Sequence, residues 1–261
     1  MWFWYIHVCV HRNGLEPVRS FRTVQGTPRR VYSMNRFTAE FLGTFFLTVF
    51  ALIGNPLGVA LGLAALIWSL GPISGAHFNP AVSVSMRLRG KIAGGELFGY
   101  IVTQFFAASL GAFVTAMLAG HDPERADSPI VGIPDAWLSA MSAETFGTLF
   151  VVFVILVVAT SKRTAGNTYA ALAIAAAVYG AASSFGLIVA FFNPAIAWAF
   201  GLHDLFSSLR AETDILQAFF GECMRFGKFL PWAVCLIFAQ LVGAVLANGF
   251  FWLIYTEDRE G

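Results

Sequence analysis

Six long apolar stretches, separated by short polar segments, dominate the pattern of the chain. They lie near residues 37–53, 57–73, 97–118, 146–160, 169–190 and 231–255. A helix that crosses the hydrocarbon core of a bilayer needs roughly 20 such residues. The pattern therefore predicts an all-α integral membrane protein with six transmembrane helices. The first two stretches are joined only through Gly54-Asn55-Pro56, which predicts a very tight turn.

The composition supports the same class of protein. Hydrophobic residues make up 57% of the 261 residues and charged residues only 12%, whereas a soluble domain carries roughly 25% charged residues. The net charge of +1 argues against nucleic acid as a partner. The three cysteines are scattered, without the spacing of a metal site or a disulfide framework, and no cofactor is indicated.

The basic residues predict the orientation in the membrane. Most of the 16 lysines and arginines lie in the N-terminal tail, between the second and third stretches, between the fourth and fifth, or at the C-terminus. The other side holds only Arg125, Arg210, Arg225 and Lys228. Because positive charge concentrates on the cytoplasmic side, both termini are expected in the cytoplasm.

The chain also repeats itself. Residues 39–44 and 143–148 share the pattern AExxGT, and each copy is followed by a second stretch, an Asn-Pro-Ala and a third stretch containing Gln104 or Gln240. Three spans per half is an odd number, so the second half must be inverted in the membrane. The predicted divisions are a tail at 1–35, a first repeat at 36–120, an outer connecting loop at 121–141, a second repeat at 142–256 and a tail at 257–261. The first ten residues are too short to span and lack the basic region of a signal peptide; Met34 is an alternative start.

The two Asn-Pro-Ala copies lie at residues 79–81 and 193–195, inside apolar sequence. Open backbone at membrane depth is tolerated only where it lines a cavity or is covered by protein. Pro at a first helical position with Asn as the cap predicts half-helices at 79–88 and 193–201 whose N-termini meet at the midplane. Their partial positive charges and the amides of Asn79 and Asn193 favour neutral polar molecules and repel cations. The predicted midplane residues are Asn79, Pro80, Ala81, Asn193, Pro194 and Ala195.

Three buried polar residues have two interpretations each. Glu40 and Glu144 could relay protons, because carboxylates within apolar spans are costly and often functional. We favour a structural role, in which each accepts hydrogen bonds from the loop that leads to a half-helix. His77 is likewise expected to order its loop rather than to bind a metal, since no second ligand stands near it in the sequence.

The run at residues 73–82, ISGAHFNPAV, closely resembles the first signature of the aquaporin (major intrinsic protein) family. The two AExxGT patterns and AQLVGA at residues 239–244 are also similar to that family, and the resemblance covers roughly residues 36–256. It implies six tilted helices, two re-entrant half-helices, a pore in each subunit, a homotetramer, and passive permeation of water or small neutral solutes.

The chain departs from this family at the expected outer constriction. Ile196 stands where the family usually has an Arg after the second Asn-Pro-Ala, and Ala197 where glycerol channels have an Asp. The other constriction positions fall on Val59 (or Leu61), Ala181 and Ala190, counted from the two Asn residues. This predicts a wide, apolar constriction with weaker exclusion of cations and a dewetting barrier to water. Phe191, Phe192 and Trp198 could refill the space, although we expect them to face helices or lipid.

An extra stretch at residues 203–228 separates the second half-helix from the last span. Ile215, Leu216, Phe219 and Phe220 follow helical spacing, which predicts an amphipathic helix. It could cap the outer vestibule, although an interfacial position on the membrane is favoured.

Three functions follow from these patterns. The leading one is a channel for water or for neutral solutes such as glycerol, urea and ammonia. The second is a structural or adhesive membrane protein with a closed pore, suggested by the missing Arg and the aromatic residues. The third, an intramembrane enzyme or proton-coupled transporter, rests on Glu40, Glu144 and His77 and is disfavoured because no nucleophile–base pair or metal constellation appears.

Overall fold

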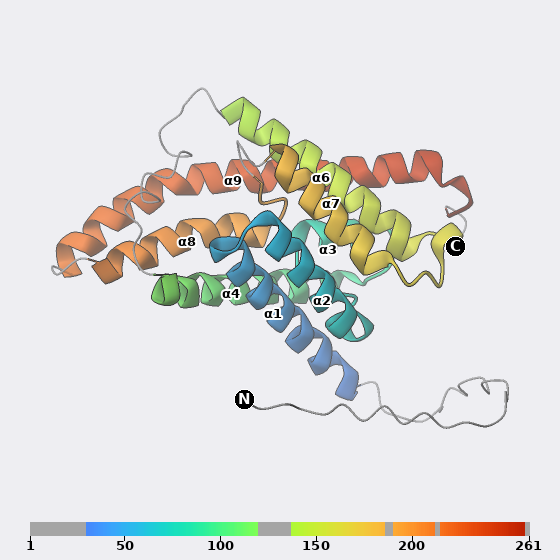
Figure 1. Cartoon of the computed structure of the whole chain (residues 1–261), viewed down its shortest axis with the longest axis horizontal. Helices are drawn as coiled ribbons and strands as arrows, with labels where there is room; N and C mark the ends of the chain where they lie inside the picture. The colour runs from blue at the N-terminus through green and yellow to red at the C-terminus, as the bar shows by residue number, and fades with distance from the viewer. Residues whose placement is uncertain (1–29, 120–136, 186–189, 212–214, 259–261) are drawn as a thin grey trace, which may run out of the picture.

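The computed structural model describes residues 30–119, 137–185, 190–211 and 215–258, and these are helical almost throughout (Figure 1). The α-helices are α1 (Arg30–Ile53), α2 (Pro56–Ser74), α3 (Pro80–Leu88), α4 (Gly94–Ala119), α6 (Trp137–Thr160), α7 (Ala170–Phe185), α8 (Pro194–Ala211) and α9 (Ile215–Ile254). Two short 3₁₀ turns, η2 (Lys162–Thr164) and η3 (Thr256–Asp258), lie after α6 and after α9.

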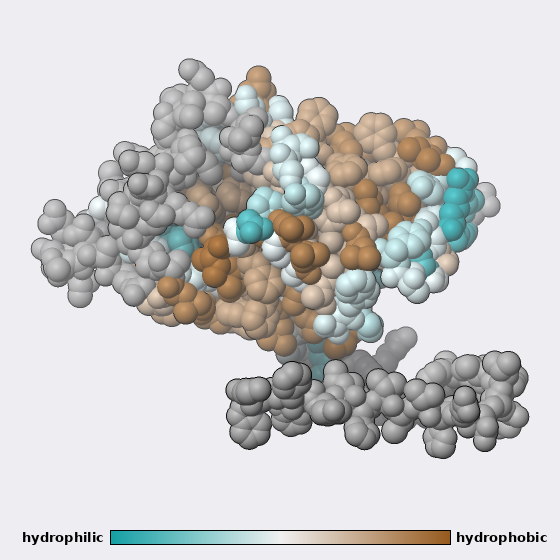
Figure 2. All heavy atoms as spheres, viewed as in Figure 1, coloured by the Kyte–Doolittle hydropathy of each residue, from teal (hydrophilic) through white to brown (hydrophobic). Residues whose placement is uncertain are grey.

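Five helices are long and apolar enough to cross a membrane: α1, α2, α4, α6 and the part of α9 from Phe229 to Ile254. The sixth predicted span is represented by α7, which is apolar but has only 16 residues. Its described residues end at Phe185, and the next four residues of the predicted span, 186–189, lie outside the described part. Large apolar side chains such as Leu138, Phe98 and Leu118 are 70–78% exposed, as expected where helices face lipid. Figure 2 shows apolar residues over much of the visible surface, with hydrophilic residues gathered near the C-terminus.

The two halves are built from equivalent contacts. Helix α1 packs against α2 and α4, and its counterpart α6 packs against α7 and α9. The short helix α3 lies against α4 and α9, as does α8. Small residues permit this close packing, because a Cβ at Gly243 of α9 would overlap the carbonyl oxygen of Thr145 on α6. The all-α inverted-repeat fold predicted from the sequence is confirmed.

Local sequence explains where α2 begins and ends. Asn55 caps it, its side chain accepting a hydrogen bond from the Gly58 N–H at 2.9 Å, and Pro56 occupies the first turn. At the other end Gly75 adopts a left-handed conformation with φ of +89°, which glycine reaches without a steric penalty. The short Gly54-Asn55 connection therefore gives the tight turn expected between the first two spans.

The second half-helix differs from its expected length. Helix α8 begins at Pro194 but continues to Ala211, well beyond the expected end at residue 201, and α9 begins at Ile215 rather than near Pro231. The stretch at 203–228 is therefore mainly helical, as the spacing within it predicted, but its described residues belong to α8 and α9 rather than to a separate amphipathic helix. At 1.5 Å per residue the 40 residues of α9 extend about 60 Å, twice the thickness of a hydrocarbon core. The longer α8 packs on protein, since the Phe206 ring meets Phe113 of α4 edge to face at 5.5 Å.

Other boundaries also move. Helix α6 begins at Trp137, inside the expected connecting loop at 121–141, and α1 begins at Arg30, inside the expected tail. The remainder of the N-terminal tail and residues 120–136 lie outside the described residues, as do the side chains of Ile215, Leu216, Phe219 and Phe220.

Candidate functional site

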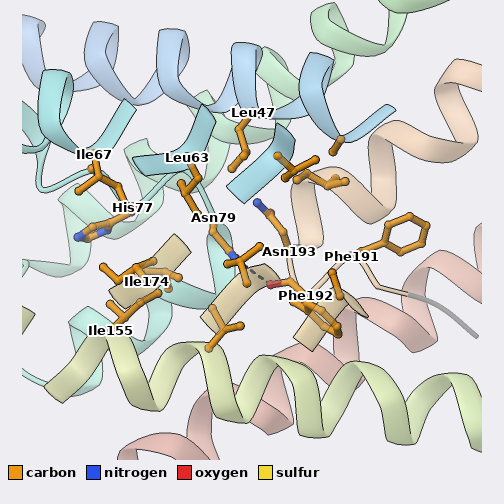
Figure 3. A pocket seen from close by; sticks show the side chains of 18 of the residues that line it. Leu47, Leu63, Ile67, His77, Asn79, Ile155, Ile174, Phe191, Phe192 and Asn193 are labelled. Carbon is orange, nitrogen blue, oxygen red and sulfur yellow. Dashed lines mark hydrogen bonds between the residues drawn. The ribbon is translucent and has the colours of Figure 1, made fainter. Parts of the chain in front are cut away.

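The centre of the candidate site is a reciprocal pair of asparagines. The Asn79 side-chain oxygen accepts from the Ala81 N–H at 2.8 Å, and that of Asn193 accepts from the Ala195 N–H at 3.0 Å, so each caps its own helix. The Asn79 amide donates to the Phe192 carbonyl at 2.8 Å, and the Asn193 amide donates to the Phe78 carbonyl at 2.9 Å. Figure 3 shows the two asparagines side by side in the cavity. The N-termini of α3 and α8 thus face each other and are joined across the repeat.

The residues before the two asparagines are conformationally strained. Phe78 has φ of +50° and Phe192 has φ of +47°, a left-handed conformation that costs a non-glycine residue about 1–2 kcal/mol. Glutamates hold this backbone in place. Glu40 accepts from the N–H groups of His77 and Phe78 at 2.9 and 2.7 Å, and Glu144 accepts from those of Phe191 and Phe192 at 2.7 and 2.8 Å.

The repeated glycine and glutamine complete this construction. A Cβ at Gly43 would overlap the Phe78 ring, and a Cβ at Gly147 would overlap the Phe192 ring. Gln104 donates to Glu40 at 2.8 Å, and Gln240 donates to Glu144 at 2.7 Å. All four glutamate and glutamine side chains are fully buried. The Glu and Gly of the AExxGT pattern and the later Gln therefore act together, because all three hold the loop that carries the Phe carbonyl.

His77 extends the network on the first repeat only. Its Nδ1 lies 3.1 Å from the Ser83 hydroxyl, and its ring meets Tyr100 edge to face at 5.0 Å. The Ser74 hydroxyl also donates to Glu40 at 2.7 Å. No cluster of three His, Cys, Asp or Glu side chains with metal-binding geometry occurs among the residues that the structure describes.

A cavity of about 350 Å³ passes the two asparagines. Its lining reaches from Asn55 and Pro56 at the α1–α2 turn to Ala159 and Ala170 beside the α6–α7 connection. Apart from these, the lining is mostly aliphatic, and its polar side chains are those of Asn55, His77, Asn79 and Asn193. No Asp, Glu, Lys or Arg of the described chain lines it.

The expected constriction residues divide into two groups. Val59, Ala190 and Ile196 line the cavity, whereas Ala181 does not and is only 2% exposed. The next residue, Ala182, lines the cavity instead. An offset of one residue turns a side chain by about 100° around a helix, so counting back from Asn193 selected the wrong face of α7. The alternative position, Leu61, is 56% exposed on the outer surface.

The aromatic residues near Ile196 also take different positions. Phe191 and Phe192 line the cavity, and Phe200 of α8, which the sequence analysis missed, lines it as well. The Phe191 and Phe200 rings lie 5.2 Å apart. Trp198 points elsewhere, since its Nε1 donates to the Ser109 hydroxyl of α4 at 3.1 Å.

Of these features, one could have been found in the sequence and one could not. Phe precedes Asn-Pro-Ala in both copies, which is the signal for the paired strained residues Phe78 and Phe192. Phe200 carries no comparable signal, because its approach to Phe191 depends on the path of the loop before α8.

Two facing, asparagine-capped helix N-termini beside an apolar cavity, within an inverted repeat of membrane-length helices, define a membrane channel fold. The sequence matches the family described as "Major intrinsic protein" over residues 27–199, and the chain belongs to this family. This family comprises membrane channels rather than enzymes. The resemblance seen in the sequence is therefore confirmed.

Several similar proteins carry names that state a function. Aquaporin AqpM of Methanothermobacter thermautotrophicus is 30% identical over 65% of this chain and 83% of its own length. Glycerol uptake facilitator protein-like 6 of Lactiplantibacillus plantarum is 34% identical over 86% of this chain and all of its own length. Aquaglyceroporin AqpS of Rhizobium meliloti is 32% identical, covering 78% and 76%. The solved aquaglyceroporin of Plasmodium falciparum has the same fold, with a TM-score of 0.63, 21% identity and coverage of 88% and 100%.

Proposed function

We propose that the protein is a passive channel for small neutral solutes, among which glycerol, urea and ammonia fit better than water alone. The observation that carries this proposal is the cavity at Asn79 and Asn193, whose described lining residues include no acidic or basic side chain except His77. Names of relatives that refer to glycerol support the same class of solute.

The centre of the cavity selects against cations. Both helix N-termini carry partial positive charge, and they face each other across the asparagine pair. Each asparagine amide has two hydrogens, and one of them is used on a Phe carbonyl. The second is left for a hydroxyl, carbonyl or water oxygen in the cavity. A neutral solute gains a hydrogen bond there, whereas a cation is repelled.

The end of the cavity near Ile196 favours solutes with an apolar face. We assign the constriction to Val59, Ala182, Ala190 and Ile196, replacing the expected Ala181 by Ala182. None of these side chains offers water a hydrogen bond, so water loses hydration without compensation. A polyol or urea, in contrast, presents carbon or a flat face to the aliphatic wall while keeping part of its polar surface in contact with the asparagines.

Swelling of proteoliposomes in water, glycerol and urea gradients tests the proposal. We expect solute-driven swelling above that of empty vesicles, with glycerol or urea raised more, relative to lipid alone, than water. Equal rates with and without protein for every solute would disprove a channel function.

A structural or adhesive role with a closed pore is the second candidate, because the Phe191 and Phe200 rings lie 5.2 Å apart at the cavity wall. The same assay separates the two. If the protein is a channel, the wild type gives flux. If the pore is closed, the wild type gives no flux, and flux appears only when Phe200→Ala removes one ring.

We also propose that the protein lies in the cell membrane as a homotetramer with both termini in the cytoplasm. Basic residues support the orientation, since Arg89, Lys162 and Arg163 cluster at the end of the molecule that holds the C-terminal turn η3.

A further inference from the structure

The C-terminal end of the chain forms a layered stack between two arginines that belong to different repeats. The Arg89 guanidinium lies over the Phe251 ring at 4.8 Å, and that ring stacks on Tyr255 at 4.9 Å with an angle of 9°. The Arg163 guanidinium lies over Tyr255 at 5.4 Å. Arg89 follows α3 of the first repeat, and Arg163 lies in η2 of the second. Such contacts are attractive because the face of an aromatic ring carries partial negative charge.

Two acidic residues close the ends of this stack. Asp258 lies with a carboxylate oxygen 3.7 Å from Arg89, and its carbonyl accepts from Arg89 at 3.1 Å. The same carboxylate accepts from the Lys162 N–H at 3.0 Å. Arg89 and Asp258 are almost completely buried, with side chains 8% and 0% exposed. Glu257 pairs with Arg163 in a more exposed position. We call residues 255–258 the C-terminal latch.

The helix held by this latch carries part of the cavity wall. Helix α3 begins at the Asn79 cap and ends just before Arg89, and its residues Val82 and Met86 line the cavity. A second contact fixes the back of the same helix, since Asn248 of α9 donates to the Ser85 hydroxyl at 2.5 Å. Both Asn248 and Ser85 are buried. Two contacts therefore set the position of Met86: the hydrogen bond of Ser85 to α9, and the attachment of Arg89, after the end of α3, to the latch.

The other repeat has no equivalent of these contacts in the described residues. Ala199 stands six residues after Asn193, as Ser85 does after Asn79, and Ala112 stands eight after Gln104, as Asn248 does after Gln240. Ala112 and Ala199 belong to one apolar cluster. The polar fixation is therefore particular to α3 and is not a general requirement of the inverted repeat.

We propose that the C-terminal latch is a positioning element that sets the width of the channel at Met86, with Asp258 and Arg89 as its central pair. The latch thereby sets the largest solute that can pass Met86. This role deepens the proposed channel function, on which its effect on transport rests. Because Asp258 reaches α3 only through Arg89, it acts as a positioning residue and not as a contact for solute.

A labelling experiment tests the latch without relying on transport. Met86→Cys is reacted with a water-soluble maleimide in proteoliposomes, with the parent chain and its three cysteines as background. Adding Asp258→Asn or Arg89→Gln is expected to raise the labelling rate at position 86 about threefold or more, within the range by which single substitutions change coupling between sites. The control is Arg36→Gln, which removes an ion pair between α1 and α4 at the same end of the molecule. It should leave the rate unchanged.

The transport readout is a ratio. Asp258→Asn should raise the permeability of a five-carbon polyol relative to urea, whereas a loss of folded protein lowers both in proportion. In a Met86→Ala background Asp258→Asn should add nothing to this ratio, because the side chain that the latch positions is gone. Unchanged labelling at position 86 in both latch variants would overturn the proposal. Absence of flux in the wild type would instead overturn the channel function, with the labelling result still deciding the latch.

Discussion

At the scale of single residues, the strained backbone at Phe78 and Phe192 is held in place by side chains far away in the sequence. Each carbonyl accepts the asparagine amide of the other repeat, and each Phe ring occupies the space beside a glycine of a long helix. Glu40 and Glu144 use their oxygens on backbone and glutamine donors. Both carboxylates are therefore committed to structure, and proton transfer would require breaking these bonds.

Gly147→Ala should destabilise the protein by about 1–3 kcal/mol, the usual cost of forcing a methyl group into a packed core. The added Cβ would overlap the Phe192 ring and push the Phe192 carbonyl away from the Asn79 amide that donates to it. Thermal unfolding in detergent measures the loss. Gly180→Ala is the matched control, because a Cβ at Gly180 of α7 meets nothing within 4 Å. Equal stability of the two variants would contradict the role assigned to Gly147.

Ile196→Arg should change selectivity. The new guanidinium narrows the cavity and adds charge at a position that lines it, so glycerol permeability should fall about tenfold relative to water, and any proton leak should decrease. Swelling rates and a pH-sensitive dye inside the vesicles measure the two effects. If both permeabilities stay the same, Ile196 does not lie at the constriction.

At the scale of elements, the short helix α3 shows how a helix too short to span is held in a membrane. Its N-terminus is fixed by the asparagine cap, and its C-terminus by Arg89 and the latch. These two ends are attached to different parts of the chain, so the helix keeps its position without crossing the bilayer. Its counterpart α8 is held in a different way: it is twice as long as α3, and it packs along α4 and α9.

The attachment of η3 should be insensitive to pH in the physiological range. Burial raises the pKa of Asp258, but hydrogen bonds from the Lys162 N–H and the Ser161 hydroxyl, with the charges of Arg89 and Lys162, lower it more, so that it lies below its ordinary value of 3.8. A depressed pKa stabilises the folded state above the ordinary value, and this contribution disappears as pH falls through the lowered value. The difference in melting temperature between wild type and Asp258→Asn should therefore be constant from pH 8 to about 5. A difference that shrinks already between pH 7 and 5 would contradict this assignment.

At the scale of the whole molecule, two properties can be tested: the proposed assembly into four subunits and the proposed cytoplasmic position of the C-terminus. Native mass spectrometry in mild detergent should give four copies of the chain, and a tag after Gly261 should be accessible only from the cytoplasm. A monomer, or a C-terminal tag accessible from outside, would contradict the proposed assembly or orientation.

Much of the architecture was predictable because membrane-spanning helices have a clear sequence pattern. The hydrocarbon core demands long apolar stretches with internally satisfied backbone, and the paired Asn-Pro-Ala and AExxGT patterns exposed the repeat. The ends of α8 and α9 were not predictable in the same way. The helical spacing between 203 and 228 predicted a separate amphipathic helix, yet the described residues of this stretch belong to α8 and α9, and part of α8 packs on α4.

In the candidate site, too, some features followed from the sequence and others only from the tertiary structure. By itself, the sequence determined the Asn caps of the two facing helices, the absence of the usual Arg at Ile196 and the symmetry of the two repeats, because these are set by residue type and local backbone chemistry. Only the tertiary structure decided that Ala182 rather than Ala181 faces the cavity, that Phe200 joins it, and that the C-terminal residues hold α3. Those facts depend on helix rotation and on contacts between residues more than 100 positions apart, such as Arg89 and Asp258, which no local pattern encodes.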